Sequence, residues 1–202
     1  MKKQLSEMSN EELWELFPII LKEYNPQYHD WYEIEKRGIL EKIKADDIAR
    51  LNHIGSSAVE GLLAKPTIDM LLEIDGCCNA AQLTADLEAI GWGLINRVND
   101  PVSFTFVKGY TPDGFADKVY HLHVKYLGNW SELYFRDYLI AHPNVAAEYG
   151  ELKQSLWKQY EHDRDGYTHA KSEFIIKHSH IAKQEFQNRY KPKDITKRGH
   201  QP

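Results

Sequence analysis

A tight glycine–serine turn between two strand-like segments is the feature that most constrains how this chain can fold. Residues 48–54 have the composition of a strand, and a Gly-Ser-Ser turn begins directly after them at Gly55. A second strand-like segment, residues 67–74, carries Asp69 fourteen positions after Gly55. Glycine lets the backbone approach a phosphate closely, and serine at the start of a helix adds a hydroxyl at the positive end of the dipole. The pattern predicts strand, turn, short helix and strand, with phosphate and metal side by side.

Four segments, in this order, resemble the GrpB family. They are HIGSSAVEGLLAKPTIDMLLEI from residue 53, HLHV from residue 121, LYFRDYLIAHP from residue 133 and YTHAKSEFI from residue 167. With the aromatic, charged segment before them, the resemblance covers roughly residues 24–186. This family is placed by fold in the DNA polymerase β type nucleotidyltransferase superfamily. The resemblance therefore implies an α/β (α+β), nucleotidyltransferase-like mixed sheet with helices. Glu60 departs from the family pattern, which commonly has proline after Val59.

The order of expected elements predicts an α/β core followed by a helical C-terminal third. A capping box at Ser9 begins a short helix that Pro18 ends. Beyond it we expect helices at 27–44 and 79–91, strands near 94–97, 103–108 and 119–126, and helices from 131 with breaks at 142–143 and 163–166. We expect one domain over 1–190, with a sheet-bearing core at about 24–130 and helices at 131–190 packed on it. A disordered basic tail is expected at 191–202.

The second strand lacks an acid that a two-metal site needs. Alternate side chains share one face of a strand, so Asp69, Leu71 and Glu73 point together. In the catalytic members of the superfamily, the second metal-binding carboxylate stands two residues after the first, which is the position of Leu71. Glu73 is about 13 Å from Asp69 along a strand, whereas two catalytic metals lie about 3.5–4 Å apart. We therefore interpret Glu73 as a solvent-facing strand end.

Two histidines, His121 and His123, occupy the strand that usually supplies the remaining acid. Two imidazoles on one face near the Asp69 carboxylate suit Zn²⁺, Mn²⁺ or Fe²⁺ better than Mg²⁺, which prefers oxygen ligands. Asp69, His121 and His123 are the candidate catalytic and metal-binding residues, for a divalent metal such as Mg²⁺, Mn²⁺ or Zn²⁺. Two alternatives remain open for the histidines: contact with an anion when protonated, and hydrogen bonds inside the sheet.

Six residues are candidates for binding nucleotide: His53, Gly55, Ser56, Ser57, Lys65 and Lys171. Lys65 is a solvated loop lysine by composition alone, but the AKPxID pattern around it belongs to the family signature. Lys171 lies one helical turn after Tyr167, and the family analogy places late-helix groups near bound nucleotide. Within FRDYL, we expect Arg136 and Asp137 to form a buried, structural ion pair.

Composition excludes several classes of function. A net charge of −5 argues against general binding of nucleic-acid backbones, which needs clustered Lys and Arg. No run of eighteen apolar residues or signal peptide occurs, so we expect no membrane association. The adjacent Cys77 and Cys78 are expected as reduced thiols in a cytoplasmic protein. The expected partner is a nucleotide or small-molecule substrate, and the sequence does not specify an oligomeric state.

Two functions of different kinds follow from these observations. The first is metal-dependent nucleotidyl transfer from an NTP to an unknown acceptor, as the resemblance implies. The second is a non-catalytic protein that binds a nucleotide or another small ligand, or a partner, on a degenerate nucleotidyltransferase fold. Leu71 separates the two, because a site with one carboxylate cannot clamp both the attacking and the leaving oxygens.

Overall fold

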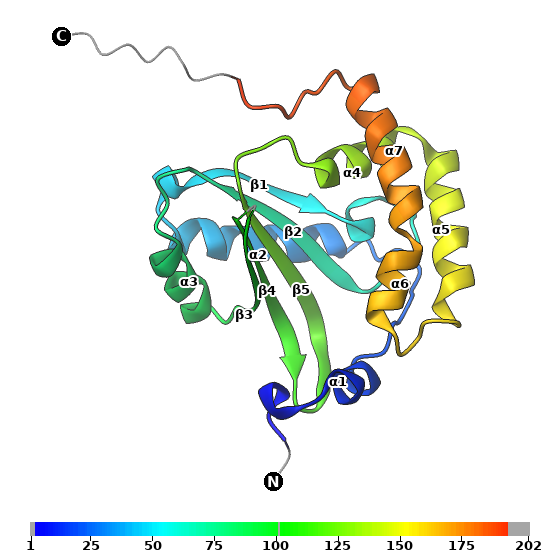
Figure 1. Ribbon diagram of the computed structural model, residues 1–202, viewed down its shortest axis with the longest axis horizontal. Helices are drawn as coiled ribbons and strands as arrows, with labels where there is room; N and C mark the ends of the chain where they lie inside the picture. Colours follow the sequence, from blue (N-terminus) through cyan, green and yellow to red (C-terminus); the bar gives the residue numbers. More distant parts are fainter. Residues whose placement is uncertain (1–2, 101, 194–202) are drawn as a thin grey trace, which may run out of the picture.

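A computed structural model describes residues 3–100 and 102–193 and contains a five-stranded mixed sheet (Figure 1). The strands are β1 (Ile48–Ile54), β2 (Thr67–Ile74), β3 (Gly93–Asn99), β4 (Val102–Thr111) and β5 (Gly114–Tyr126). Their order in the sheet is β1-β2-β5-β4-β3. β2 and β5 run parallel, and the other neighbours are antiparallel. The predicted α/β architecture is confirmed, and the bounds of β1 and β2 agree with those expected from the sequence.

Helices surround the sheet on two sides (Figure 1). They are α1 (Asn10–Leu16), α2 (Tyr28–Lys42), α3 (Ala80–Ala89), α4 (Ser131–Ala141), α5 (Pro143–Trp157), α6 (Arg164–Ala170) and α7 (Ser172–Glu185), with 3-10 turns at Leu5–Glu7, Ala45–Asp47 and Ser56–Ala58. In Figure 1, α2 lies behind the sheet, α3 lies to its left and α5 to α7 stand to its right. The C-terminal third is helical, as predicted.

Helix ends follow the capping residues in the sequence. Ser9 accepts a hydrogen bond from the Glu12 amide and begins α1, and the Asn79 side chain caps α3 in the same way. The expected break at 163–166 is wrong in its position. Asp163 instead caps α6 by accepting a hydrogen bond from the Gly166 amide at 2.8 Å, so Gly166 lies in the first turn of the helix. The break falls before Asp163.

The two faces of β2 bury different residues. On the face toward α2, Ile68, Met70 and Leu72 are fully buried, and they pack with helix residues such as Tyr32. On the opposite face, Leu71 is fully buried against Ile54 and the α4 residue Leu133. Helix α4 therefore covers the C-terminal half of this second face, while the N-terminal half, which carries Asp69, remains open to a cavity.

Glu73 does not face solvent as the sequence suggested, and that expectation is wrong. Its side chain is 0% exposed and pairs with Arg50 at 2.5 Å, while its carboxylate also accepts the Gly128 amide at 3.1 Å. Arg50 donates in addition to the main-chain carbonyls of Gly128 and Tyr190. A buried carboxylate is tolerated here because β1 brings a guanidinium directly opposite it.

The expected ion pair in α4 is present. Arg136 and Asp137 are paired at 2.7 Å with side chains 14% and 10% exposed. Arg136 also donates to the His53 carbonyl at 2.8 Å, and Asp137 accepts from the Tyr190 hydroxyl at 2.6 Å. The pair joins α4 to β1 and to the segment after α7, so its role is structural.

The remaining expectations concern the cysteines, a membrane span, the single domain and the C-terminal tail. Cys77 and Cys78 are free thiols in the turn between β2 and α3. Among residues 3–100 and 102–193, no helix is both long and apolar enough to cross a membrane. The single domain stays a prediction, and residues 194–202 of the expected tail lie outside the described residues.

Candidate functional site

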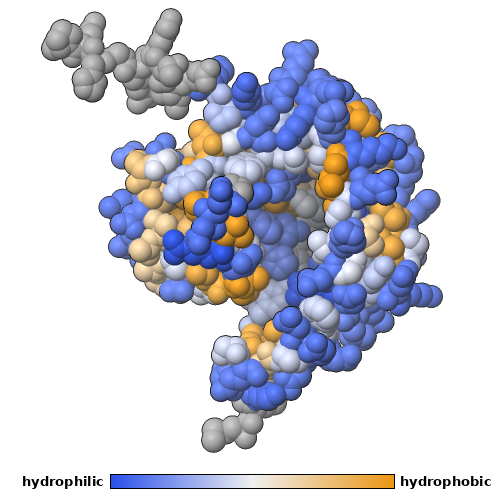
Figure 2. Space-filling model, in the orientation of Figure 1, coloured by the Kyte–Doolittle hydropathy of each residue, from blue (hydrophilic) through white to orange (hydrophobic). Residues whose placement is uncertain are grey.

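A cavity of about 1120 Å³, here called the central cavity, lies between the open face of the sheet and helices α5 to α7. Figure 2 shows the molecule hollowed at this place, with hydrophilic residues at the bottom of the hollow. Eight of the nine site residues predicted from the sequence line it: Gly55, Ser56, Ser57, Lys65, Asp69, His121, His123 and Lys171. The structure therefore gathers into one cavity residues that are up to 116 positions apart (55 to 171) in the sequence.

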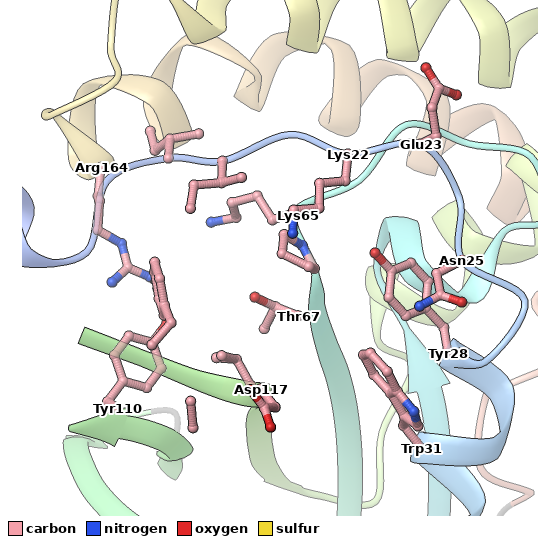
Figure 3. Close-up of a pocket in the computed structure, with 16 residues that line it drawn as sticks. Lys22, Glu23, Asn25, Tyr28, Trp31, Lys65, Thr67, Tyr110, Asp117 and Arg164 are labelled. Atoms are coloured by element: carbon pink, nitrogen blue, oxygen red, sulfur yellow. The ribbon is translucent and has the colours of Figure 1, made fainter. Parts of the chain in front are cut away.

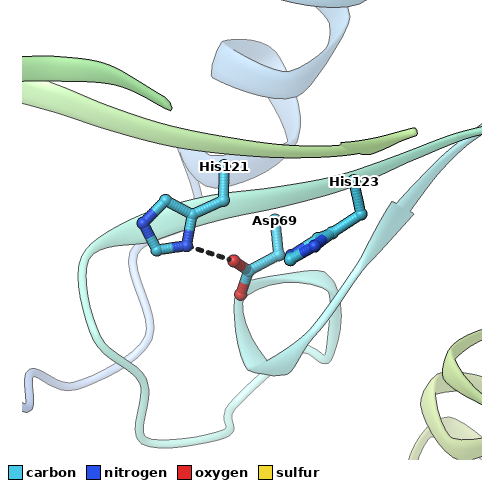
Figure 4. A group of neighbouring side chains, drawn as sticks. All are labelled: Asp69, His121 and His123. Carbon is cyan, nitrogen blue, oxygen red and sulfur yellow. Dashed lines mark hydrogen bonds and ion pairs between the residues drawn. The ribbon is translucent and has the colours of Figure 1, made fainter. Parts of the chain in front are cut away.

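Asp69, His121 and His123 form the candidate metal group (Figure 4). The parallel pairing of β2 with β5 places Asp69 beside His121 and Leu71 beside His123. One possible ligand atom from each of the three residues lies within 4.8 Å of the others. One carboxylate oxygen and two imidazole nitrogens are a donor set typical of Zn²⁺, Mn²⁺ or Fe²⁺.

His121 is held from both sides of its ring. Its Nδ1 lies 3.1 Å from the Asp69 carboxylate, and its Nε2 lies 2.7 Å from the Tyr110 hydroxyl, which accepts a hydrogen bond from Arg164 at 3.2 Å. With an Nδ1–H donating to Asp69, Nε2 accepts from the Tyr110 hydroxyl; Nδ1 can bind an ion only after its proton is lost or moves to Nε2, where the Tyr110 oxygen would accept it. Tyr110 thus stands where metal-binding histidines usually have a supporting acceptor.

The charges of the group depend on its surroundings. Burial by itself would raise the pKa of Asp69, but the hydrogen bond from His121 and the positive charges of His121, His123 and Lys65 outweigh it and lower the pKa to about 2. Burial lowers the pKa of His123, although Asp69 opposes the change. At neutral pH the site therefore presents an ionised carboxylate and a neutral His123 imidazole, both able to bind a cation.

Gly55 brings the serine turn against the acid. Its φ is +72°, and a Cβ atom at this position would lie 2.5 Å from Asp69 Oδ2. A side chain is therefore excluded both by the backbone conformation and by contact with Asp69. The two features that the sequence pattern linked, the turn and the acid, touch each other in the structure.

Three lysines line the same cavity: Lys153 is buried, and Lys65 and Lys171 are half-buried. Lys153 donates to Ser56 Oγ at 2.9 Å and to the Leu63 carbonyl. Lys171 lies over the Tyr167 ring, 3.9 Å from its centroid. Within residues 3–100 and 102–193, none of the three forms an ion pair with an acid.

Burial is the main cause of low lysine pKa values in the cavity, and the neighbouring cations add to it. The pKa falls to about 8 for Lys65 and to about 7 for both Lys153 and Lys171, while Asp69 acts in the opposite direction. Within the described part of the chain, none of the three ammonium groups is paired directly with an acid, so they are available to balance the charge of a bound anion.

Sequence reasoning missed Lys153. One signal was available, because Lys153 follows Tyr149 by one turn on the buried side of α5, together with Val145. A lysine on an apolar helix stripe is rarely buried without a reason. Nothing in the local sequence, however, indicates that this stripe faces Ser56.

His53 lies apart from the central cavity. It is paired with Met70 and shares the sheet face toward α2, where its ring stacks on Tyr32 with centroids 4.9 Å apart. Its Nε2 is 3.1 Å from Ser57 Oγ, and burial lowers its pKa to about 4. His53 therefore supports the serine turn from behind and does not line the cavity.

The fold and the site define an α/β protein with a candidate metal group and a lysine-lined cavity. The sequence profile of the GrpB protein family matches residues 18–180, and the chain belongs to this family. It is 38% identical over 128 residues to a UPF0157 protein of Pseudomonas aeruginosa, covering 63% of this chain and 52% of that protein. It is 31% identical over 161 residues to the glutamate-rich protein GrpB of Alkalihalophilus pseudofirmus, covering 78% and 91%.

A solved structure has a similar fold. The crystal structure of the conserved protein GrpB from Enterococcus faecalis matches with a TM-score of 0.73 and 27% identity, over 83% of this chain and 99% of that one. A UPF0157 protein of Bacillus subtilis is 32% identical over 157 residues, which is 75% of this chain and 43% of the relative. The chain thus spans about half the length of the P. aeruginosa and B. subtilis relatives.

Proposed function

We propose that this protein transfers a nucleotidyl group from an NTP to an acceptor, with a divalent metal ion. The observation that carries the proposal is that one cavity holds both the Asp69, His121 and His123 group and three lysines that form no ion pair with an acid among the described residues. The resemblance of the serine turn and Asp69 to the DNA polymerase β type nucleotidyltransferases supports it.

The lysines supply the chemistry for a polyphosphate. Lys65, Lys153 and Lys171 repel one another, and each has a lowered pKa, so an incoming anion relieves both the repulsion and the desolvation of these charges. Ser56 Oγ already accepts a hydrogen bond from Lys153, which places hydroxyl and ammonium together at the turn. A phosphate chain with several negative charges matches this arrangement.

The three candidate ligands fit one metal ion and no more. Leu71 occupies the position of the second acid and is fully buried against Leu133. Asp69 alone cannot supply the ligands for a second metal ion. A bound ion would polarise phosphate oxygens and neutralise charge that develops on them. Asp69 and His121 would hold it, with the Tyr110 hydroxyl bonded to the second ring nitrogen of His121.

In the transfer, an acceptor oxygen forms a bond to the α-phosphorus, the bond from that phosphorus to its bridging oxygen breaks, and pyrophosphate leaves toward the lysines. The proton of the acceptor hydroxyl passes to a base of the site. His123 has two uses here, as third ligand or as that base, because it makes no hydrogen bond to another described residue. The metal content of His123→Ala distinguishes them.

A second function is favoured by one specific observation. The burial of Leu71 leaves a single carboxylate on the open face of β2, and a single carboxylate supports binding of a nucleotide more readily than a two-metal reaction. The competing proposal is a non-catalytic protein that binds nucleotide or another phosphorylated small molecule.

Calorimetric titration tests both proposals. Tripolyphosphate and each of the four common NTPs are titrated with and without Mn²⁺, and pyrophosphate release is followed by phosphorus NMR. We expect tripolyphosphate and NTPs to bind, and we expect slow pyrophosphate release from an NTP. Mn²⁺ should raise the affinity for NTP, and Asp69→Asn should abolish this increase. Binding without release by the wild type supports the non-catalytic function. No binding at millimolar concentrations would overturn both.

A further inference from the structure

A second cavity, of about 380 Å³, lies at the N-terminal end of β2, next to the central cavity (Figure 3). Its volume falls within the range typical of small-molecule sites. Lys65 and Arg164 line both cavities, so the two share a wall. The other residues that line the second cavity do not line the central cavity.

Aromatic rings form two opposite sides of the second cavity. Tyr28 and Trp31 of α2 meet edge to face with ring centroids 5.5 Å apart, and Figure 3 shows them on one side. Tyr110 lies on the other side with Arg164, and its ring is 5.5 Å from that of Phe115. Two aromatic sides of this kind suit a flat, conjugated ring.

Polar groups without partners converge on the same space. Tyr28 is 1% exposed and Thr67 is 7% exposed, yet neither hydroxyl makes a hydrogen bond to another described residue. The Trp31 indole N–H has no partner among these residues either, and Asn25 uses only its carbonyl oxygen, which accepts the Gln27 amide. None of these four groups is fully enclosed by protein, so all of them offer hydrogen bonds to a ligand with polar edges in this cavity.

The position of the second cavity relates it to the metal group. Thr67 and Val119 line its base, each two residues before Asp69 and His121 on the same strand faces. Two residues of a strand span about 6.6 Å, a distance that a pentose can bridge. A ligand with a ring in the second cavity and phosphates in the central cavity would pass Lys65 and Arg164 at the shared wall.

We infer that the second cavity binds the nucleobase of the nucleotide whose phosphates occupy the central cavity. The inference rests on the proposed function and adds to it the place and the chemistry of base recognition. Trp31 and Asn25 donate to acceptors on the base edge, the hydroxyls of Tyr28 and Thr67 take either role, and the rings contact its faces or edges.

Comparison of an NTP with tripolyphosphate tests the inference, because tripolyphosphate lacks a base. Each is titrated calorimetrically into wild type, Thr67→Val, Trp31→Leu and the control Thr84→Val, which makes the same change on α3, away from both cavities. We expect the tightest-binding NTP to lose about tenfold in affinity in Thr67→Val and Trp31→Leu. Tripolyphosphate should bind all four proteins equally, and Thr84→Val should bind the NTP as wild type does.

Each other outcome is decisive. Unchanged NTP affinity in both second-cavity variants overturns base binding there, while the proposed function stands if tripolyphosphate still binds. An equal loss of affinity for NTP and tripolyphosphate also overturns base binding in the second cavity, because tripolyphosphate has no base for the variants to affect. Failure of wild type to bind tripolyphosphate or any NTP overturns the proposed function itself. Thermal melting of each variant confirms that it is folded.

Discussion

Two carboxylates on the same face of β2 have opposite surroundings. Glu73 is completely buried and meets the Arg50 guanidinium and the Gly128 amide. Asp69, four residues earlier, faces a cavity with two imidazoles and, close by, Lys65. At the Glu73 end, the opposite charge is supplied by the fold. At the Asp69 end, the lysines of the central cavity have no such partner among the described residues, and the proposed anionic ligand would balance them.

The two ends differ in whether each charged side chain already has a partner of opposite charge. A buried ion with its partner already in place stabilises the fold only through that pair, and removing one member leaves the other uncompensated. Buried ions without partners destabilise the free protein and strengthen binding of what neutralises them. The same strand face therefore combines a fixed ion pair, Glu73 with Arg50, and the candidate site around Asp69.

The largest expected effect is at the buried ion pair of Glu73 with Arg50. Glu73→Gln removes the charge that Arg50 faces, and we expect the free energy of unfolding to fall by about 3 kcal/mol, the lower end for such pairs, because Arg50 is still 26% exposed. Urea unfolding measures this. Affinity for tripolyphosphate should not change in the folded fraction. A loss of affinity without a loss of stability would reverse the roles assigned to the two ends.

A smaller effect, in binding instead of stability, is expected at the other end. Lys153→Met keeps the aliphatic chain but removes the ammonium beside Ser56, and we expect tripolyphosphate affinity to fall by about 30-fold. Stability at pH 7 should be unchanged or higher, because an unpaired buried charge is lost. Lys158→Met, an exposed lysine just after α5, is the matched control. Clear destabilisation by Lys153→Met alone would mark Lys153 as structural.

The smallest expected change in affinity comes with pH, and it is opposite in sign to the change in stability. The pKa of Lys153 and that of Lys171 are lowered to about 7 in the folded protein from 10.5, so the unfolded chain binds more protons between about pH 7 and 10. Stability of the free protein should therefore rise with pH across this range. Tripolyphosphate affinity should fall, by about tenfold from pH 6.5 to 8.5, as the lysines lose their protons.

Urea unfolding and calorimetry at fixed ionic strength follow the two quantities. Lys153→Met should flatten both curves, since it removes one of the titrating groups. If stability and affinity change with pH in the same direction, the lysines are not the groups responsible.

Much of the fold could be predicted because its signals are local. The apolar strands, the Ser9 and Asn79 caps and the Gly55 turn each follow from a few neighbouring residues. The gathering of Asp69 with His121 and His123 followed from the family resemblance together with the period of a strand, and the parallel register of β2 and β5 places them together.

The misses depend on partners distant in sequence. Glu73 was expected in solvent because nothing near it shows that Arg50 lies opposite. Lys153 was overlooked because its contact with Ser56 spans 97 residues and arises only when α5 docks. His53 was expected in the cavity, but strand alternation puts it on the face opposite Asp69, in register with Met70. This last error was avoidable from the sequence period alone.

The hydrogen bond from Arg50 to the carbonyl of Tyr190 joins residues 140 positions apart. Contacts of such long sequence separation form late in folding, since the entropy of closing the intervening loop must be overcome first. During synthesis, Arg50 therefore gains this partner only after residue 190 has left the ribosome. Until then the guanidinium opposite the buried Glu73 is held by fewer bonds, so the pairing of β1 with β2 is completed late.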